Sequence, residues 1–308
     1  MPVPRAAYDS VHGLALGDAF GERWFFVPST QAGPRIATRR RPDDEARWHW
    51  TDDTAMALAL LRVVHEHGAV EQDRLAGSFA ATYQADRYRG YGPGMHALLG
   101  RLEECGEPAR WRELAPGLFD GTGSLGNGGA MRVAPVGAWF AGEPDRAAAQ
   151  AALSAEVTHA HPQGVAGAVA VAVAAALAAG SRGDAVPEPA ALLRAVADAT
   201  PDGPARDGVR AAFDVPGDTP AWRAADQLGN GHRLTAADTV PFALWSAAHH
   251  LDDLTEALWT TAAGLGDVDT TCAITGGIVA ARTGLAGVPP EWTERREALP
   301  DWVEELAG

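Results

Sequence analysis

Two short acidic segments, far apart in the chain, each stand at the start of an apolar, helix-forming stretch. The first is Trp50–Thr54 (WTDDT) and the second is Gly266–Thr271 (GDVDTT). Thr and Asp are favoured at the N-cap and in the first turn of a helix, so one such segment alone is most simply a helix cap. Two of them, each with a pair of carboxylates, indicate a shared cation site.

If the two segments meet, all the donor atoms that they bring are oxygens. Asp52 and Asp53 can fan out at a non-helical cap, which suits two metal ions, whereas Asp267 and Asp269 point to one side of an extended segment. Hard oxygen ligands select Mg²⁺, Mn²⁺ or Ca²⁺ over zinc or copper. Four packed carboxylates would repel one another without a cation. The candidate metal ligands are Thr51, Asp52, Asp53, Asp267, Asp269 and Thr270.

Two glycine-rich segments could hold a phosphate group. Tyr88–Gly94 precedes a helix that begins near Met95, where free N–H groups favour an anion, although an ordinary turn also fits. Gly121–Val136 carries five closely spaced glycines and Asn127, and it is either a pyrophosphate cradle or a flexible loop. Two metal ions beside such a cradle would favour hydrolysis at a sugar attached to a diphosphate. The spacing does not say which bond is cut.

Two further segments carry polar side chains with more than one reading. Thr158–Gly164 contains His159 and His161, and the absence of a third nitrogen or sulfur ligand nearby argues against a zinc site. The two histidines therefore either contact a ligand or simply precede a helix that begins at Pro162. In the N-terminal helix, Asp18 and Glu22 share a face. Such a pair of like charges is unfavourable without a cation, so the two acids either stand beside the metal or face solvent.

The elements that must position these residues are helices. Strand-like alternation is sparse, and the glycines at positions 13, 17 and 21 make a smooth stripe that lets another helix approach closely. We therefore expect an all-α, compact many-helix globule, a single domain over residues 1–308 in which 287–308 is a peripheral C-terminal tail. The predicted helices are 6–20, 53–67, 71–87, 93–104, 144–155, 162–180, 188–199, 204–213, 220–228, 238–248, 252–263, 269–283 and 298–307.

Composition excludes several classes of function. The net charge of −15 argues against general nucleic-acid binding, and the absence of lysine excludes Schiff-base and P-loop lysine chemistry. Two isolated cysteines fit a reducing cytosol, and the N-terminus lacks a signal-peptide core. The apolar run Val165–Ala179 is too short to span a bilayer. We expect a cytoplasmic monomer that does not bind membranes, and the arginine-only, Ala-rich composition suggests a bacterial source.

Taken together, the motifs resemble the ADP-ribosylglycohydrolase family, which includes the enzyme that removes ADP-ribose from arginine of dinitrogenase reductase. The matching pieces keep the family's order over about residues 8–284. They are LALGDAFG within Gly13–Gly21, WTDDT at Trp50–Thr54, RGYG at Arg89–Gly92, SLGNGGAMRVAP at Ser124–Pro135, THAHP at Thr158–Pro162, DTVPFAL at Asp238–Leu244 and GDVDTTCAITGG at Gly266–Gly277.

The resemblance implies an all-α fold with two Mg²⁺ or Mn²⁺ ions bound by the six oxygen-bearing residues above. The reaction it implies is attack of water at C1″ of the distal ribose of an ADP-ribosylated protein or small molecule. Asp52, Asp53 and Asp269 would be catalytic. The implied substrate-binding residues are Gly90, Tyr91, Gly92, Ser124, Leu125, Gly126, Asn127, Gly128, Gly129, Met131 and His159.

The chain departs from the family pattern at one acidic position. Many members carry a glutamate four residues after the glycine that matches Gly21, where this chain has Phe25, and its acid is instead Glu22. Either Glu22 replaces that catalytic acid from a neighbouring turn, or this branch of the family works without it, and we take Glu22 as the candidate catalytic residue. The leading hypothesis is hydrolysis of an ADP-ribosyl–arginine or guanidinium N-linkage. The alternatives are hydrolysis of a small ribosylated or ADP-ribosylated metabolite, and non-catalytic ADP-ribose binding.

Overall fold

The computed structural model describes residues 3–39 and 47–307, and the regular elements within these ranges are helices. Two isolated β-bridges, Trp48 with Arg296 and Gly126 with Thr235, are the extended pairings recorded there. The all-α prediction is therefore confirmed. Most predicted helices are present within one to three residues of their predicted ends.

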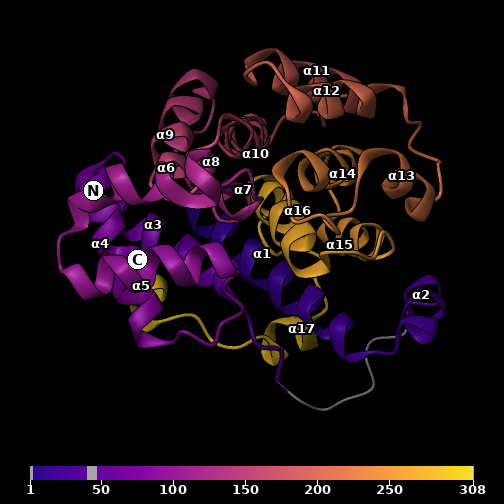
Figure 1. Cartoon of the computed structure of the whole chain (residues 1–308). Helices are drawn as coiled ribbons and strands as arrows, with labels where there is room; N and C mark the ends of the chain where they lie inside the picture. The colour runs from indigo at the N-terminus through magenta and orange to yellow at the C-terminus, as the bar shows by residue number, and fades with distance from the viewer. Residues whose placement is uncertain (1–2, 40–46, 308) are drawn as a thin grey trace.

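Two helices from opposite ends of the chain cross at the centre, α1 (Arg5–Glu22) and α16 (Val268–Thr283) (Figure 1). They touch through the glycine stripe. A Cβ atom on Gly17 would lie 2.0 Å from the carbonyl oxygen of Cys272, and one on Gly21 would lie 2.5 Å from Cα of Asp269. Because no side chain fits between the backbones, α1 brings its acids directly against the start of α16.

The other helices surround this pair in two groups (Figure 1). The first group consists of four helices that are consecutive in the sequence: α3 (Asp52–His67), α4 (Gln72–Ala85), α5 (Pro93–Cys105) and α6 (Trp111–Gly121). The second group contains α7 (Gly128–Met131), α8 (Ala134–Trp139), α9 (Pro144–Glu156), α10 (Pro162–Gly180), α11 (Pro189–Ala199), α12 (Pro204–Ala211), α13 (Ala221–Leu228), α14 (Ala236–His249) and α15 (Leu254–Ala262).

The alanine-rich helix α10 is a core element. By length and composition it could cross a membrane, but 78 % of its most apolar 18-residue window is buried inside the protein. Its small side chains allow close packing against α8, α9, α14 and α16. A helix that is surrounded by other helices is apolar on every face, so the composition of α10 is that of a core helix.

Among the described residues, five helices lie outside the predicted ranges: α2 (Ser29–Ala37), α6, α7, α8 and α17 (Pro290–Arg295). Proline and glycine interrupt α2 and α6, and α6 is distorted at Leu118–Asp120, so their periodic signal is weak. The predicted helix 298–307 is reduced to the short α18 (Asp301–Glu304) and a 3₁₀ turn. The tail nevertheless packs inward, since the buried Trp292 ring stacks on Phe20 with centroids 4.6 Å apart.

Candidate active site

The acidic start of α3 is held by a carboxylate from another helix. Asp18 on α1 is fully buried and accepts hydrogen bonds from the backbone N–H and hydroxyl groups of both Thr51 and Thr54, at 2.6 to 3.1 Å. Thr51, the N-cap residue, makes no side-chain cap of its own. Asp18 therefore takes the capping role from outside the helix and fixes the direction in which Asp52 and Asp53 leave the backbone.

Burial and mutual repulsion raise the pKa of each acid in this cluster. Burial raises the pKa of Asp52 to about 8, with the charges of Asp18 and Asp267 adding to the effect. The pKa values of Asp53 and Asp269 are raised well above normal by burial and then by the neighbouring carboxylates. Burial also raises the pKa of Asp18 to about 6, although its hydrogen bonds oppose the shift. Ionised carboxylates are therefore energetically unfavourable in this cluster as long as no cation lies beside them.

The chemistry of this cluster fits a divalent cation. Oδ1 of Asp53 is buried and has no hydrogen-bond partner, and the neighbouring donors are carboxylate and hydroxyl oxygens, which suit hard ions. In residues 3–39 and 47–307, however, no three His, Cys, Asp or Glu side chains are already arranged as a ligand set. The cluster therefore has the donors that a cation needs, without a completed coordination shell.

The glycine-rich loop before α7 is tied to the start of α14. The backbone N–H of Asn127 donates to the carbonyl of Leu234, and Gly126 pairs with Thr235. The amide Nδ2 of Asn127 donates to Oγ1 of Thr239 at 3.0 Å and to Oδ2 of Asp267 at 2.7 Å. One side chain therefore joins the loop, α14 and the acidic cluster, so the sequence segment is an ordered wall and not a flexible loop.

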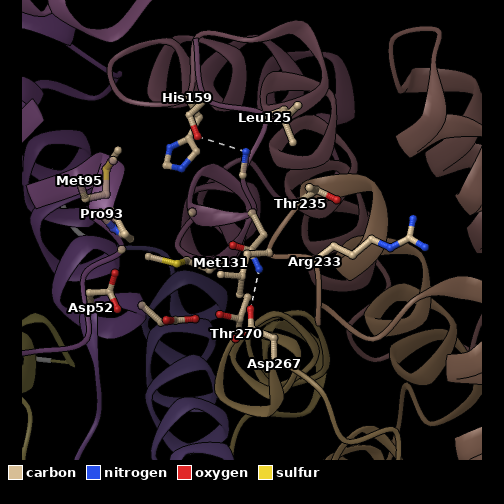
Figure 2. Close-up of a pocket in the computed structure, with 18 of the residues that line it drawn as sticks. Asp52, Pro93, Met95, Leu125, Met131, His159, Arg233, Thr235, Asp267 and Thr270 are labelled. Atoms are coloured by element: carbon tan, nitrogen blue, oxygen red, sulfur yellow. Dashed lines mark hydrogen bonds between the residues drawn. The ribbon is translucent and has the colours of Figure 1, made fainter. Parts of the chain in front are cut away.

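These elements enclose a pocket of about 520 Å³. Asp52, Asp267 and Thr270 lie at one end of it and His159 at the other, with Met131 between them (Figure 2). The residues that line it are Asp52, Asp53, Gly90, Gly92, Pro93, Gly94, Met95, Phe119, Thr122, Gly123, Ser124, Leu125, Gly126, Asn127, Gly128, Met131, His159, Arg233, Leu234, Thr235, Asp267, Asp269 and Thr270. Acids at one end and glycine-rich backbone along the wall are the features of a site for a sugar joined to an anion.

The sequence profile of the ADP-ribosylglycohydrolase family matches residues 4–308. The chain belongs to this family. It is 29 % identical over 285 residues to ADP-ribosylhydrolase ARH3 of Homo sapiens, covering 82 % of this chain and 76 % of that protein. It is 26 % identical over 307 residues to ADP-ribosylarginine hydrolase Tri1 of Pseudomonas putida, covering 96 % of this chain and 75 % of that protein.

A solved structure agrees with the fold. It is described as an ADP-ribosylglycohydrolase-related protein complex, and it superposes with a TM-score of 0.68 over 98 % of this chain and 95 % of that one. At 23 % identity this likeness shows the fold alone. Family membership supports a hydrolase acting on ADP-ribose conjugates in general.

The structure brings together most of the residues expected from the ADP-ribosylglycohydrolase pattern. All the expected substrate contacts line the pocket except two. The Tyr91 ring is buried against Tyr83, with centroids 5.2 Å apart, and Gly129 faces α9, where an added Cβ would lie 3.2 Å from Cβ of Ala155. Gly129 is one residue beyond Gly128 in a helical turn, which rotates it away from the cavity.

Two of the expected metal-site and catalytic residues also stand outside the pocket lining. The Thr51 hydroxyl is directed at Asp18 and Asp53. Glu22 ends α1 as a half-buried side chain, and burial, followed by the charge of Asp18, raises its pKa to about 7. The remaining members, Asp52, Asp53, Asp267, Asp269 and Thr270, line the pocket together.

Several lining residues were not expected from the sequence. Phe119 lies just before the glycine-rich segment Gly121–Val136, and Thr122 and Gly123 lie within it. Arg233–Thr235 lie just before α14. The segment Gly229–Gly231 also supports the site, because the carbonyl of Asn230 accepts the N–H of Asp267. The one available signal was the dense Gly and Asn content next to α14, which marks backbone that approaches another group closely.

Proposed function

We propose that this chain is a metal-dependent hydrolase that cleaves the glycosidic bond between the distal ribose of ADP-ribose and an N-linked arginine or guanidinium acceptor. The observation that carries the proposal is the convergence of carboxylates from α3 and α16 at one end of a pocket walled by the Ser124–Gly128 backbone. This arrangement separates the two tasks of the reaction, activation of water and binding of the diphosphate.

The oxygens of Thr51, Asp52, Asp53, Asp267, Asp269 and Thr270 would hold two divalent cations, Mg²⁺ or Mn²⁺. Support comes from the orphaned Oδ1 of Asp53 and from the raised pKa values of the buried acids. When bound, such ions lower the pKa of a water molecule and bind sugar hydroxyls. We infer that water attacks C1″, that the bond from C1″ to the acceptor breaks, and that the acceptor nitrogen leaves with a proton.

The chain's own groups would orient the substrate. Gly90 and Gly92, together with the backbone of Ser124–Gly128, present N–H groups and open space for the diphosphate. An N-linked arginine acceptor is supported by the similarity of the chain to ADP-ribosylarginine hydrolase Tri1. Glu22 lies outside the lining, so the proposal gives it no catalytic step.

The test is a substrate panel with added Mg²⁺ or Mn²⁺, read by release of ADP-ribose. We expect turnover of an ADP-ribosyl-arginine peptide, lost in Asp53→Ala and Asp269→Ala and in protein treated with EDTA. Asp301→Ala, which removes an exposed acid from the first turn of α18, is the matched control. Full activity in either pocket variant or with EDTA would exclude the metal mechanism.

The same panel separates the alternatives. Faster turnover of free small-molecule conjugates, or of a serine-linked peptide, would reassign the acceptor. Tight ADP-ribose binding by calorimetry, with metal present and no product formed, would indicate a binding protein. We also propose a cytoplasmic location, which the two separate free cysteines support. We further propose a monomeric state, which size-exclusion chromatography with light scattering would test.

A further inference from the structure

The imidazole of His159 lies in a narrow slot between Gly128 and Thr158, at the end of the pocket opposite the acids (Figure 2). One edge of the slot is backbone, because a Cβ on Gly128 would lie 2.7 Å from Nε2 and 2.6 Å from Cε1 of the ring. On the other side, Nδ1 lies 2.8 Å from Oγ1 of Thr158. The ring is therefore flanked by the backbone of Gly128 on the Nε2 side and by the Thr158 hydroxyl at Nδ1.

A buried arginine ties the two sides of this slot together. Arg132 is fully buried, and its Nη2 donates to Oγ1 of Thr158 at 2.9 Å and to the carbonyl of Ser154 at 2.8 Å. Its Nη1 donates to the carbonyl of Gly128 at 3.1 Å. The guanidinium thus fixes the distance between the threonine and the glycine that enclose the ring.

Because the Arg132 guanidinium can only donate, it determines the direction of the hydrogen bonds from Arg132 to Thr158 and from Thr158 to His159. Guanidinium has donors only, so Oγ1 of Thr158 must accept from Arg132. Within the described ranges, Nδ1 of His159 is the other recorded partner of that hydroxyl. Thr158 is fully buried, so its hydroxyl hydrogen satisfies its bonding by pointing at Nδ1. Nδ1 is then an acceptor, and the ring hydrogen is on Nε2.

We propose that Arg132 and Thr158 are positioning residues that fix His159 as the neutral Nε2–H tautomer, a preset donor to an oxygen atom of bound ADP-ribose. The identity of that ligand rests on the proposed function, whereas the tautomer does not. Diphosphate oxygens are acceptors only, and ribose hydroxyls accept as well as donate, so a fixed donor matches either. His159 acts as a binding group and not as a general acid or base.

The electrostatic surroundings agree with a neutral ring. Burial, followed by the charge of Arg132, lowers the pKa of His159 to about 3. The ring consequently stays uncharged over the physiological pH range. Its contribution to ligand binding should be independent of pH between 5.5 and 8.

The tautomer is tested directly by ¹⁵N NMR of histidine-labelled protein without substrate, with His159→Leu used to assign the signals. We expect Nδ1 of His159 in the region of bare ring nitrogens and Nε2 in the region of nitrogens that bear hydrogen, unchanged from pH 5.5 to 8. Thr158→Val should shift both signals toward a mixture of tautomers, and Thr158→Ser should restore them. An Nδ1–H tautomer in the wild type, titration near pH 6.5, or no change in Thr158→Val would overturn the proposal.

The second measurement is the Kd for ADP-ribose by calorimetry. Thr158→Val should weaken binding about tenfold, the size expected when one neutral hydrogen bond loses its alignment. Thr200→Val is the control, because Thr200 is the buried C-cap residue of α11 and its hydroxyl donates to the carbonyl of Val196, away from the pocket lining. Equal binding by Thr158→Val and wild type would overturn the role in binding. If ADP-ribosyl conjugates are not hydrolysed but the tautomer is as stated, the proposed function fails and this inference stands.

Discussion

Asp18 on α1 accepts two hydrogen bonds from Thr54 on α3, at 2.6 Å from the hydroxyl and 3.1 Å from the backbone N–H. With the matching bonds from Thr51, the carboxylate satisfies the exposed donors at the start of α3. Asp18 thereby locks the helix that carries Asp52 and Asp53 against α1. A residue outside the pocket lining sets the direction of two residues inside it.

Replacing Asp18 by Asn should lower the free energy of unfolding by about 3 kcal/mol, because an amide N–H₂ would face buried donors and leave them unsatisfied. Urea denaturation followed by circular dichroism measures this. The control is Asp73→Asn, which removes an exposed partner of Arg112 and should cost less than about 1 kcal/mol. Equal effects of the two changes would contradict the capping role.

Replacing Asp53 by Asn should abolish turnover and yet stabilise the metal-free protein. Burial, followed by the charges of the neighbouring carboxylates, raises the pKa of Asp53 well above normal, so the metal-free protein must protonate this side chain in order to fold, a cost that an amide avoids. We expect the Tm in EDTA to rise by about 2–4 °C. Asp198→Asn, an exposed change on α11, should leave the Tm unaltered. A lower Tm for Asp53→Asn would mean that this carboxylate stabilises the fold without metal.

The stability of the metal-free protein should fall as pH rises from 6.5 to 8. The pKa of Asp52 is raised to about 8 and that of Glu22 to about 7, so at the start of this window the folded chain holds protons that the unfolded chain, with carboxyl pKa values of about 4, has already released, and it loses them as the pH rises. The pKa of His12 is lowered to about 4 and that of His159 to about 3, mainly by burial, and these two rings reduce stability only below about pH 6.5.

Differential scanning fluorimetry across this window measures the effect. The Tm should decline with pH in EDTA and stay level with saturating Mn²⁺ or Mg²⁺, because a bound cation favours the ionised acids. A flat profile in EDTA would show that the acids are not protonated in the folded state.

Gly17→Ala should be severely destabilising, by about 3 kcal/mol, since the new methyl group would meet the Cys272 carbonyl oxygen of α16. It should also weaken Mn²⁺ binding, measured by calorimetry, because α1 and α16 must move apart. Gly100→Ala on α5 is the matched control. Outside its own helical turn, no atom of the described residues lies within 4 Å of its added Cβ, so this change should stabilise the protein by about 0.5–1 kcal/mol.

Glu297→Gln should raise KM about fivefold with little change in kcat. Glu297 binds the Arg89 guanidinium at two points, both 2.8 Å, and the Arg89 carbonyl accepts the N–H of Asp52. A bidentate pair of this kind orders the Gly90–Gly92 segment at the pocket. Glu103→Gln, which removes the looser partner of Arg87, is the control. An unchanged KM would mean that the pair does not order the segment.

The sequence was sufficient for much of the fold because the long helices carry strong signals. The start of α3 at Asp52 and its end before Gly68, whose φ is +74°, follow from local residue preferences. The glycine stripe on α1 predicted close helix packing, and α16 confirms it. Helices α2 and α6 were missed because their proline and glycine content is typical of loops.

The sequence predicted which residues belong to the site, but it did not predict the hydrogen bonds that join them. Local preference places Asp52 and Asp267 at helix starts, but it cannot show that Asn127 bonds to Asp267. The pairing of Trp48 with Arg296 depends on contacts between distant parts of the chain, which no local pattern encodes. Orientation was the other limit, since Gly129 differs from Gly128 only by one step around a helical turn.

The pairing between Trp48 and Arg295–Glu297 also bears on how the protein is made. The first half of the acidic cluster leaves the ribosome with α3, but α16 and the segment that fastens Trp48 come from the last 41 residues of the 308. During synthesis the two pairs of carboxylates therefore cannot meet until α16 has been made. A nascent chain stalled before α16 would expose the apolar surface of α1 that α16 covers, and the site would form only after α16 has been made and packs against α1.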